Sequence, residues 1–252
     1  MSDGYELLID LHRDAERQGP GGVEQTLRAI ELTGLDRTAP LRIADLGCGT
    51  GAAAKVLAEH LNAEIVAVDT AQAFLDELRA AVERDPHLAG ITTLACSIDE
   101  LPFDDGELDV IWSEGAIYNI GFDTGVSQWM RYLRPGGKLV VSELTWLTGR
   151  RPVELHDHWT REYPEVDVAS AKIGVLEQHG LRPEAYFVLP PHCWLENYYV
   201  PLETRFEEFL ARHGHSAAAA SVVAGERDEI ELYRRYSQYF GYGVYVAAKP
   251  PS

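Results

Sequence analysis

The feature that most constrains this chain is a glycine-rich segment between an apolar run and a helix-like run. Residues 41–46 are mostly apolar, residues 47–51 read Gly-Cys-Gly-Thr-Gly, and residues 52–61 have the composition of a helix. Glycine permits positive φ and a close approach of the backbone to another molecule. In a strand–loop–helix unit, the loop amides and the helix N-terminus face a ligand at the carboxyl edge of a sheet. The segment therefore predicts an α/β fold with a ligand site at residues 45–51.

Further apolar runs alternate with helical segments along the chain. Helices are predicted at about residues 71–85, 168–179 and 225–240, and a helical stretch at 5–33 is interrupted by glycines and proline at 16–22. Strands are predicted at residues 41–46, 65–69, 91–96, 108–112, 138–142, 185–189 and 243–248. Alternation of this kind indicates right-handed βαβ units and a parallel sheet that is buried on both faces.

The length and spacing predict one domain over residues 1–252, because single α/β domains of roughly 200–250 residues are common. Helices at residues 1–38 precede a core formed by residues 39–189 and 241–252. The long excursion at residues 190–240 has helical character and many aromatic residues, and we interpret it as a cap inserted between the last two strands.

Charge and cysteine content exclude several classes of function. The formal net charge of −18 disfavours nucleic-acid and membrane partners, since both carry negative charge. The three widely spaced cysteines do not resemble a disulfide framework or a zinc site, and no signal peptide or apolar run of about 18 residues is evident. These features predict a cytoplasmic protein with a small-molecule substrate; its oligomeric state is open, a homo-oligomer included.

Asp69 ends the second predicted strand, 18 residues after Gly51, where a carboxylate can accept hydrogen bonds from both hydroxyls of a ribose. Residues 49–54 also fit the G-x-G-x-x-G/A pattern of dinucleotide-binding proteins, which makes an NAD-binding protein or a non-catalytic nucleoside-binding module an alternative. Asp45 argues against it, because its carboxylate repels a pyrophosphate but attracts a cationic amino-acid group. No second mononucleotide-binding half follows residue 144, and Lys55 follows Ala54, which rules out a Walker loop.

Several motifs in order resemble those of class I S-adenosylmethionine-dependent methyltransferases. They are Asp45-Leu46-Gly47-Cys48-Gly49-Thr50-Gly51, Asp69, Glu100-Leu101-Pro102-Phe103 with Asp109-Val110-Ile111-Trp112, and Leu133-Arg134-Pro135-Gly136-Gly137-Lys138-Leu139. Residues 16–21 and 112–119 resemble a bacterial branch of small-molecule enzymes related to quinone-biosynthesis methyltransferases. The resemblance implies a doubly wound, Rossmann-like, seven-stranded sheet, mostly parallel with an antiparallel last strand, plus a helical cap.

The resemblance also implies S-adenosyl-L-methionine as the cofactor, with the helices of residues 1–38 closing its site. Asp45, Gly47, Gly49 and Gly51 then line the methionine moiety, Asp69 holds the ribose, and Thr70 flanks it. Ser97 and Ile98 meet the adenine edge, although many relatives have Asp in place of Ser97. Gln18 and Gly19 are candidates for contact with the cofactor carboxylate.

Three residues are candidates for a catalytic role. Glu114 follows the fourth strand, where it either contacts the cofactor ammonium or the substrate, or serves as an ordinary helix cap. Tyr118 and the neighbouring Asn119 either orient substrate or cofactor or contribute to packing. Glu143, placed at the end of the fifth strand, is a candidate general base.

The cap supplies the remaining candidates. His192, Trp194 and Tyr198 either contact the substrate or build the core of the cap, since aromatic faces stabilise sulfonium and other cations. His156 and His158 have no evident third ligand, so no metal is expected.

The sequence thus predicts in-line methyl transfer to a small-molecule acceptor. One alternative is an enzyme of the same fold that consumes the cofactor without methylating an acceptor, by cyclisation or alkyl transfer that releases methylthioadenosine. The acceptor, the atom methylated and the need for a base stay undetermined.

Overall fold

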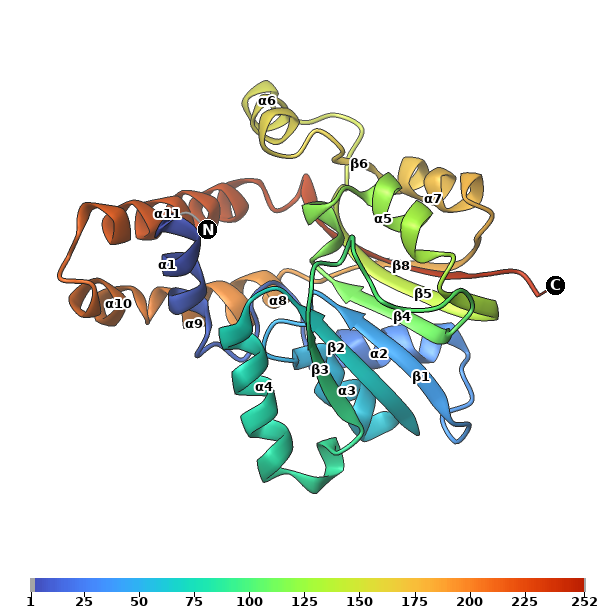
Figure 1. The fold of residues 1–252 in the computed structure, drawn as a ribbon. Helices are drawn as coiled ribbons and strands as arrows, with labels where there is room; N and C mark the ends of the chain where they lie inside the picture. The colour runs from blue at the N-terminus through green and yellow to red at the C-terminus, as the bar shows by residue number, and fades with distance from the viewer. Residues whose placement is uncertain (1–2, 252) are drawn as a thin grey trace.

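The computed structural model describes residues 3–251 as an eight-stranded sheet with helices on both faces (Figure 1). The strand order is β3-β2-β1-β4-β5-β8-β7, and β6 pairs with β5 off this path. The strands are β1 (Leu41–Leu46), β2 (Ala63–Asp69), β3 (Ile91–Ala95), β4 (Leu108–Glu114), β5 (Leu133–Trp146), β6 (Asp167–Val168), β7 (Arg182–Val188) and β8 (Phe240–Ala248). The predicted fold class is confirmed: the seven expected strands are present, and the two-residue β6 is an addition.

The central strands form because their side chains are apolar on both sides. In β1 and β4, nearly every residue is buried, as expected for a parallel sheet between two layers of helices. The parallel register pairs Asp45 of β1 with Ala67 of β2 and Trp112 of β4. As a result, the carboxyl ends of β1, β2 and β4 meet at one edge of the sheet.

β8 is antiparallel to both of its neighbours, β5 and β7. Its register with β5 runs without interruption from Lys138↔Ala248 to Trp146↔Phe240. β5 therefore extends four residues beyond its predicted end at residue 142, so the prediction that Glu143 stands at the end of this strand is wrong. Glu143 lies inside the strand, opposite Gly243.

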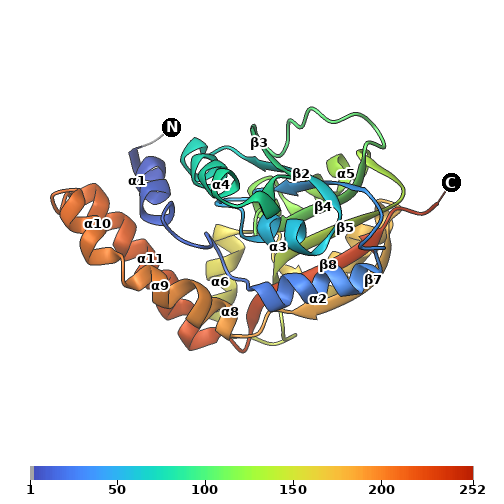
Figure 2. The ribbon, with the colours of Figure 1, turned by 90° about the horizontal axis from the view of Figure 1, so that it is seen from below.

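Two helical layers enclose the sheet (Figure 1), and Figure 2 shows one of them from below. One layer consists of α2 (Val23–Thr33), α3 (Ala52–His60) and α4 (Gln72–Arg84), and the other of α5 (Phe122–Trp129) and α7 (Ala169–Gln178). Short turns of helix lie at Pro86–Leu88 and Ile117–Asn119. Each layer has its own apolar core, with Leu57 and Leu75 on the first side and Phe122 and Leu176 on the second.

A helical excursion joins β7 to β8, in the place predicted for a cap. It contains α8 (His192–Trp194), a π-helical turn (Leu195–Tyr199), α9 (Val200–Glu203), α10 (Phe206–Arg212) and α11 (Ala217–Tyr236). α11 begins eight residues before the predicted helix, because the alanine run at 217–220 is helical and Ser216 caps it by accepting a hydrogen bond from the Ala219 amide.

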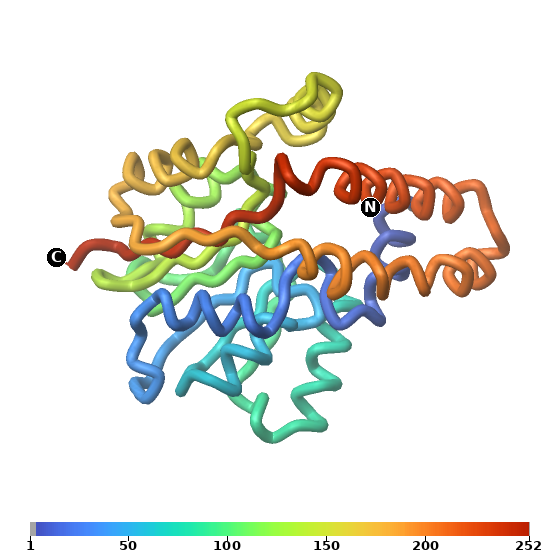
Figure 3. The backbone as a smooth tube through the Cα atoms, turned by 180° about the vertical axis from the view of Figure 1, so that it is seen from behind, coloured from blue at the N-terminus to red at the C-terminus, as the bar shows by residue number. Residues whose placement is uncertain are grey.

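The N-terminal helix α1 (Asp3–His12) packs against α11, as Figure 3 shows from behind. α6 (Val153–Glu162) stands apart from both layers beyond the end of β5 (Figure 1). Within the described residues, no helix combines the length and the apolar character needed to cross a bilayer. Residues 1–2 and 252 of the predicted domain lie outside the described part of the chain.

Candidate functional site

The glycine loop lies between the end of β1 and the start of α3. The amides of Gly47 and Cys48 both donate to the carbonyl oxygen of Val68, at 2.8 and 2.9 Å, which fixes the loop against β2. Gly49 has φ +54, and a Cβ there would lie 2.1 Å from Oε1 of Gln18. Gly51 has φ +81, and a Cβ there would lie 2.4 Å from a methyl of Leu78 on α4. The glycines are therefore required for both backbone conformation and close packing.

A small cavity of about 80 Å³ lies over this loop, and we call it the loop cavity. Predicted cofactor residues from three separate segments line it: Gln18, Gly19, Asp45, Gly47, Gly49 and Glu114. Gly51 is not in this wall, and its role is in the turn and in packing on α4.

Asp45 is the most unusual group in the loop cavity. It is 1% exposed, and its Oδ2 has no hydrogen-bond partner among residues 3–251. Burial, followed by the charge of Glu114, raises the pKa of Asp45 to about 8. An unpaired buried carboxylate is costly, so this position is suited to a cationic group that would pair with it.

Glu114 is held by three donors from the protein. It forms an ion pair with Arg17, and its Oε1 accepts hydrogen bonds from Oγ1 of Thr26 at 2.7 Å and from Nε1 of Trp112 at 3.0 Å. The carboxylate therefore joins the end of β4 to the N-terminal segment and to α2. It still lines the loop cavity, where its negative charge helps to raise the pKa of Asp45.

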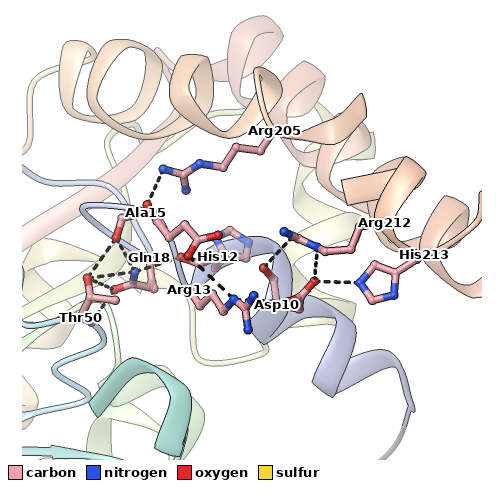
Figure 4. A network of polar contacts seen from close by, with 10 residues as sticks. Asp10, His12, Arg13, Ala15, Gln18, Thr50, Arg205, Arg212 and His213 are labelled. Carbon is pink, nitrogen blue, oxygen red and sulfur yellow. Dashed lines mark hydrogen bonds and ion pairs between the residues drawn. The ribbon is translucent and has the colours of Figure 1, made fainter. Parts of the chain in front are cut away.

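Gln18 closes the loop cavity from the N-terminal side. Its Oε1 accepts from the Thr50 amide at 2.8 Å, and its Nε2 donates to Oγ1 of Thr50 and to the carbonyl oxygens of His12 and Ala15. Figure 4 shows the hydrogen bonds between the side-chain amide of Gln18 and Thr50. Both ends of the Gln18 side chain are thus engaged by the protein, which positions Gly19 and Pro20 beside the cavity.

The same network continues to the cap (Figure 4). Oδ2 of Asp10 on α1 lies 3.0 Å from Nε of Arg212 and 2.8 Å from Nε2 of His213, and Arg205 donates to the Asp14 carbonyl oxygen. The N-terminal segment is therefore tied to the glycine loop at one end and to α10 at the other.

A larger cavity of about 480 Å³, the nucleoside-side cavity, adjoins the loop cavity. Predicted residues line it at the ends of β2, β3 and β4: Asp69, Thr70, Ser97, Ile98, Tyr118 and Asn119. Oδ2 of Asp69 accepts from the Gly49 amide at 2.9 Å, and its Oδ1 accepts from the Ala71 amide at 2.8 Å. Each carboxylate oxygen can accept a further hydrogen bond, so Asp69 stays able to bind a pair of hydroxyls. Burial raises the pKa of Asp69, while these backbone amides lower it.

A third cavity, of about 200 Å³, is lined mainly by aromatic rings, and we call it the aromatic cavity. Its rings come from the β4 loop, α6, the cap and β8: Tyr118, Trp159, Tyr163, Trp194, Tyr198 and Tyr242. It shares Gln18 and Gly115 with both other cavities, and Tyr198 and Glu229 with the nucleoside-side cavity. The three cavities therefore meet beside Gly115.

Two other predicted site residues, Glu143 and His192, line none of the three cavities. Glu143 is 1% exposed, and neither of its oxygens has a hydrogen-bond partner among residues 3–251. Burial raises its pKa to about 7, opposed by the charge of Lys172. His192 begins α8 and lines none of the three cavities, whereas Trp194 and Tyr198 from the same segment line the aromatic cavity.

Residues 156 and 158 lie on α6, so their side chains point in different directions: the ring of His156 lies near Trp146 and that of His158 near Trp159. The described residues contain no group of three potential metal ligands.

Sequence reasoning missed several residues of the site. Arg17 stands next to the predicted Gln18, and its ion pair with Glu114 depends on a contact 97 positions away. Glu229 was inside a predicted helix, but nothing in its local pattern showed which face meets the site. Trp159 lies on α6, a helix that was not predicted, and Tyr163 directly follows it. The aromatic content of residues 190–240 was the one available signal, and it pointed to the correct segment.

Comparison with known proteins finds a family model that matches the central part of the chain. Residues 44–141 match the methyltransferase domain family. Demethylmenaquinone methyltransferase from Beutenbergia cavernae is 30% identical over 146 residues, which cover 58% of this chain and 57% of that protein. The chain spans about half the length of the curated relatives it matches.

Solved structures agree over nearly the whole chain. A methyltransferase from Geobacter sulfurreducens in complex with S-adenosyl-L-homocysteine has a TM-score of 0.80 at 17% identity, with 98% of each chain covered. The [4+2]-cyclase SpnF has a TM-score of 0.77 at 20% identity, with 98% of this chain and 94% of that chain covered. At these identities the likeness shows the shared fold.

Proposed function

We propose that this chain, which belongs to the class I S-adenosylmethionine-dependent methyltransferases, transfers the methyl group of S-adenosyl-L-methionine to a small-molecule acceptor. The observation that carries the proposal is the junction of the three cavities at Gly115. The loop cavity and the nucleoside-side cavity together suit an amino acid joined to a nucleoside, and the aromatic cavity opens where the two meet.

The residues present fit such a cofactor. The unpartnered oxygen of Asp45, next to Glu114, suits an ammonium group, and Asp69 suits the hydroxyls of a ribose. Ser97 and Ile98 lie farther along the same cavity, together with the exposed Asp99, whose carboxylate can accept from an adenine amino group in place of the acid missing at Ser97. Thr70 completes this wall, and Gly49 leaves room for close approach.

When bound, the cofactor supplies an electrophilic methyl group on a positively charged sulfur. Gln18, Gly19 and Gly115 border both the loop cavity and the aromatic cavity, so they position the two reactants in line. The rings of Tyr118 and Tyr198 limit the access of water to this junction. Holding the reactants at about 3 Å in the correct orientation lowers the barrier to such a reaction.

Glu143 lines none of the three cavities, so it is not placed to take a proton directly from a substrate. Its neighbour Leu144 and Tyr163 line the aromatic cavity, and the Tyr163 hydroxyl lowers the pKa of Glu143. Asn119 donates to the Ala116 carbonyl oxygen, so its role is to shape the loop that carries Tyr118.

The test is cofactor binding by Asp69→Asn. Calorimetry with S-adenosyl-L-homocysteine should show at least about tenfold weaker binding, because one of the two oxygens facing the ribose becomes an amide donor. Asp76→Asn, on the exposed side of α4, is the matched control and should bind like the wild type. Equal affinity of the Asp69 variant and the wild type would remove Asp69 from the ribose role.

A second candidate is a cofactor-consuming enzyme of this fold that does not methylate an acceptor. The similarity in fold to a cyclase and the presence of the aromatic cavity favour this second candidate. Product analysis separates the two, since methyl transfer yields adenosylhomocysteine and attack on another carbon of the sulfonium yields methylthioadenosine. A thermal-shift comparison tests the NAD-binding alternative: stabilisation by NADH and not by adenosylhomocysteine would refute the methyltransferase proposal.

A further inference from the structure

The residues that line the aromatic cavity carry little charge compared with an ordinary protein surface. Of its twelve lining residues, Glu229 is the only Asp, Glu, Lys or Arg, and six are Tyr or Trp. The cavity therefore combines aromatic faces with one negative charge and no positive charge.

The aromatic rings that line the cavity meet at steep angles and are not stacked on one another. Trp194 and Tyr242 meet at an interplanar angle of 66° with centroids 4.8 Å apart, and Tyr118 and Tyr163 meet at 75° with centroids 6.2 Å apart. Rings set nearly at right angles present faces to a ligand from more than one direction. The negative face of an aromatic ring attracts a cation, most strongly where water is excluded.

The carboxylate of Glu229 is available to such a cation. Its Oε1 accepts from the hydroxyl of Tyr199 at 2.9 Å, whereas Oε2 has no donor among residues 3–251. The Glu229 residue is exposed to solvent, yet desolvation of its carboxylate by the surrounding atoms and the charge of Glu226 raise the pKa of Glu229. Glu226 itself has an unpartnered Oε2, and its Oε1 lies 3.4 Å from His12. Glu226, Glu229 and His12 all line the nucleoside-side cavity, which adjoins the aromatic cavity.

We infer that the acceptor held in the aromatic cavity is a small aliphatic amine, bound as a cation between the aromatic rings and Glu229. This inference rests on the proposed function and specifies its substrate class. A volume of about 200 Å³ corresponds to roughly seven water-sized groups, which limits the acceptor to a compact molecule.

The reaction is balanced with Glu229 as the proton acceptor. The bound ammonium first transfers a proton to Oε2 of Glu229, which leaves a lone pair on nitrogen. That lone pair forms the new N–C bond to the methyl carbon while the C–S bond breaks, and its electron pair goes to sulfur. The products are a methylated ammonium, the thioether and a protonated Glu229, which keeps the total charge unchanged.

The test uses two probes of nearly the same shape, choline and its neutral isostere 3,3-dimethylbutan-1-ol. Binding of each is measured by calorimetry on the protein saturated with S-adenosyl-L-homocysteine. Choline, whose quaternary nitrogen has no lone pair and cannot be methylated, should bind at least about tenfold more tightly than the isostere.

Glu229→Gln should remove most of this preference while it leaves the affinity for the isostere within about twofold, because the shape of the side chain is kept. The matched control is Glu231→Gln, which makes the same change of charge on the same helix at a residue that lines none of the three cavities, and it should keep the preference.

Equal binding of the two probes, no binding of choline, or an unchanged preference in Glu229→Gln would each overturn the inference. The affinity for S-adenosyl-L-homocysteine, measured on the same proteins, distinguishes this failure from failure of the proposed function. Normal cofactor binding with no choline preference refutes the amine alone, whereas loss of cofactor binding in the wild type refutes the proposed function.

Discussion

Replacement of Asp45 by Asn should make the protein more stable and less able to bind its cofactor. The carboxyl is 1% exposed, and its pKa is raised from 3.8 to about 8. Between these two values the folded protein holds a proton at Asp45 that the unfolded chain releases. Folding then costs about 1.4 kcal/mol for each pH unit above 3.8, since one pKa unit corresponds to that free energy.

The sign follows from proton counting. An acid whose pKa is raised by folding binds more protons in the native state, so the free energy of unfolding falls as pH rises through this window. The loss begins above the unfolded pKa near 3.8 and levels off above about 8. Asn does not titrate. The stability advantage of Asp45→Asn should therefore grow by roughly 3 kcal/mol between pH 5 and pH 7.

Urea denaturation of the wild type and the variant at several pH values between about 5 and 8 measures this difference. Asp228→Asn, on the exposed side of α11, is the control, because folding does not remove that carboxyl from water. A difference between Asp45→Asn and the wild type that stays constant with pH would refute the reasoning. The same variant should bind S-adenosyl-L-homocysteine more weakly, since Asn cannot release a proton and become the negative partner of the ammonium group, as Asp45 can when the cation binds.

Two further substitutions separate the roles of residues around the glycine loop. Glu114→Gln should destabilise the protein by about 2–4 kcal/mol in urea denaturation, because it leaves the guanidinium of Arg17 without its partner; unchanged stability with lost turnover would instead indicate a direct catalytic role. Gly49→Ala should lower both stability and cofactor affinity, because its Cβ would displace Gln18. Gly136→Ala is the control for backbone strain, since its φ is +79 and a Cβ there meets nothing within 4 Å. Equal effects of the two glycine substitutions on stability would show that the contact with Gln18 is unimportant.

The sequence was sufficient for the parts of the fold that repeat a simple pattern. β1, β2 and β4 are continuous apolar runs, and the glycines at 47, 49 and 51 identify the turn that follows β1. α5 was not predicted, since its eight residues include Gly125, which packs against Ile117 and weakens the helical signal. β6 has two residues, too few for any periodicity.

The sequence predicted the site residues whose positions follow from local strand and loop patterns. It did not predict the residues that are brought together by contacts between distant segments. Asp45 and Asp69 follow from strand ends, because the carboxyl ends of parallel strands meet at one edge. The aromatic cavity instead joins Tyr118, Tyr163, Trp194 and Tyr242 from four separate elements, and their spacing in the sequence has no relation to their positions in space. Glu143 was misplaced because β5 continues to Trp146, with the partner strand more than 90 residues away.

The position of β8 has a consequence for how the protein is made. This strand, residues 240–248, lies between β5 and β7 and is hydrogen-bonded to both. A nascent chain that has left the ribosome only as far as α11 therefore presents two unpaired strand edges, which are sites for association with other chains. Only when residues 240–248 emerge can the gap be filled, so completion of the sheet is delayed until after most of the chain has been translated, and truncation within this strand should yield aggregates.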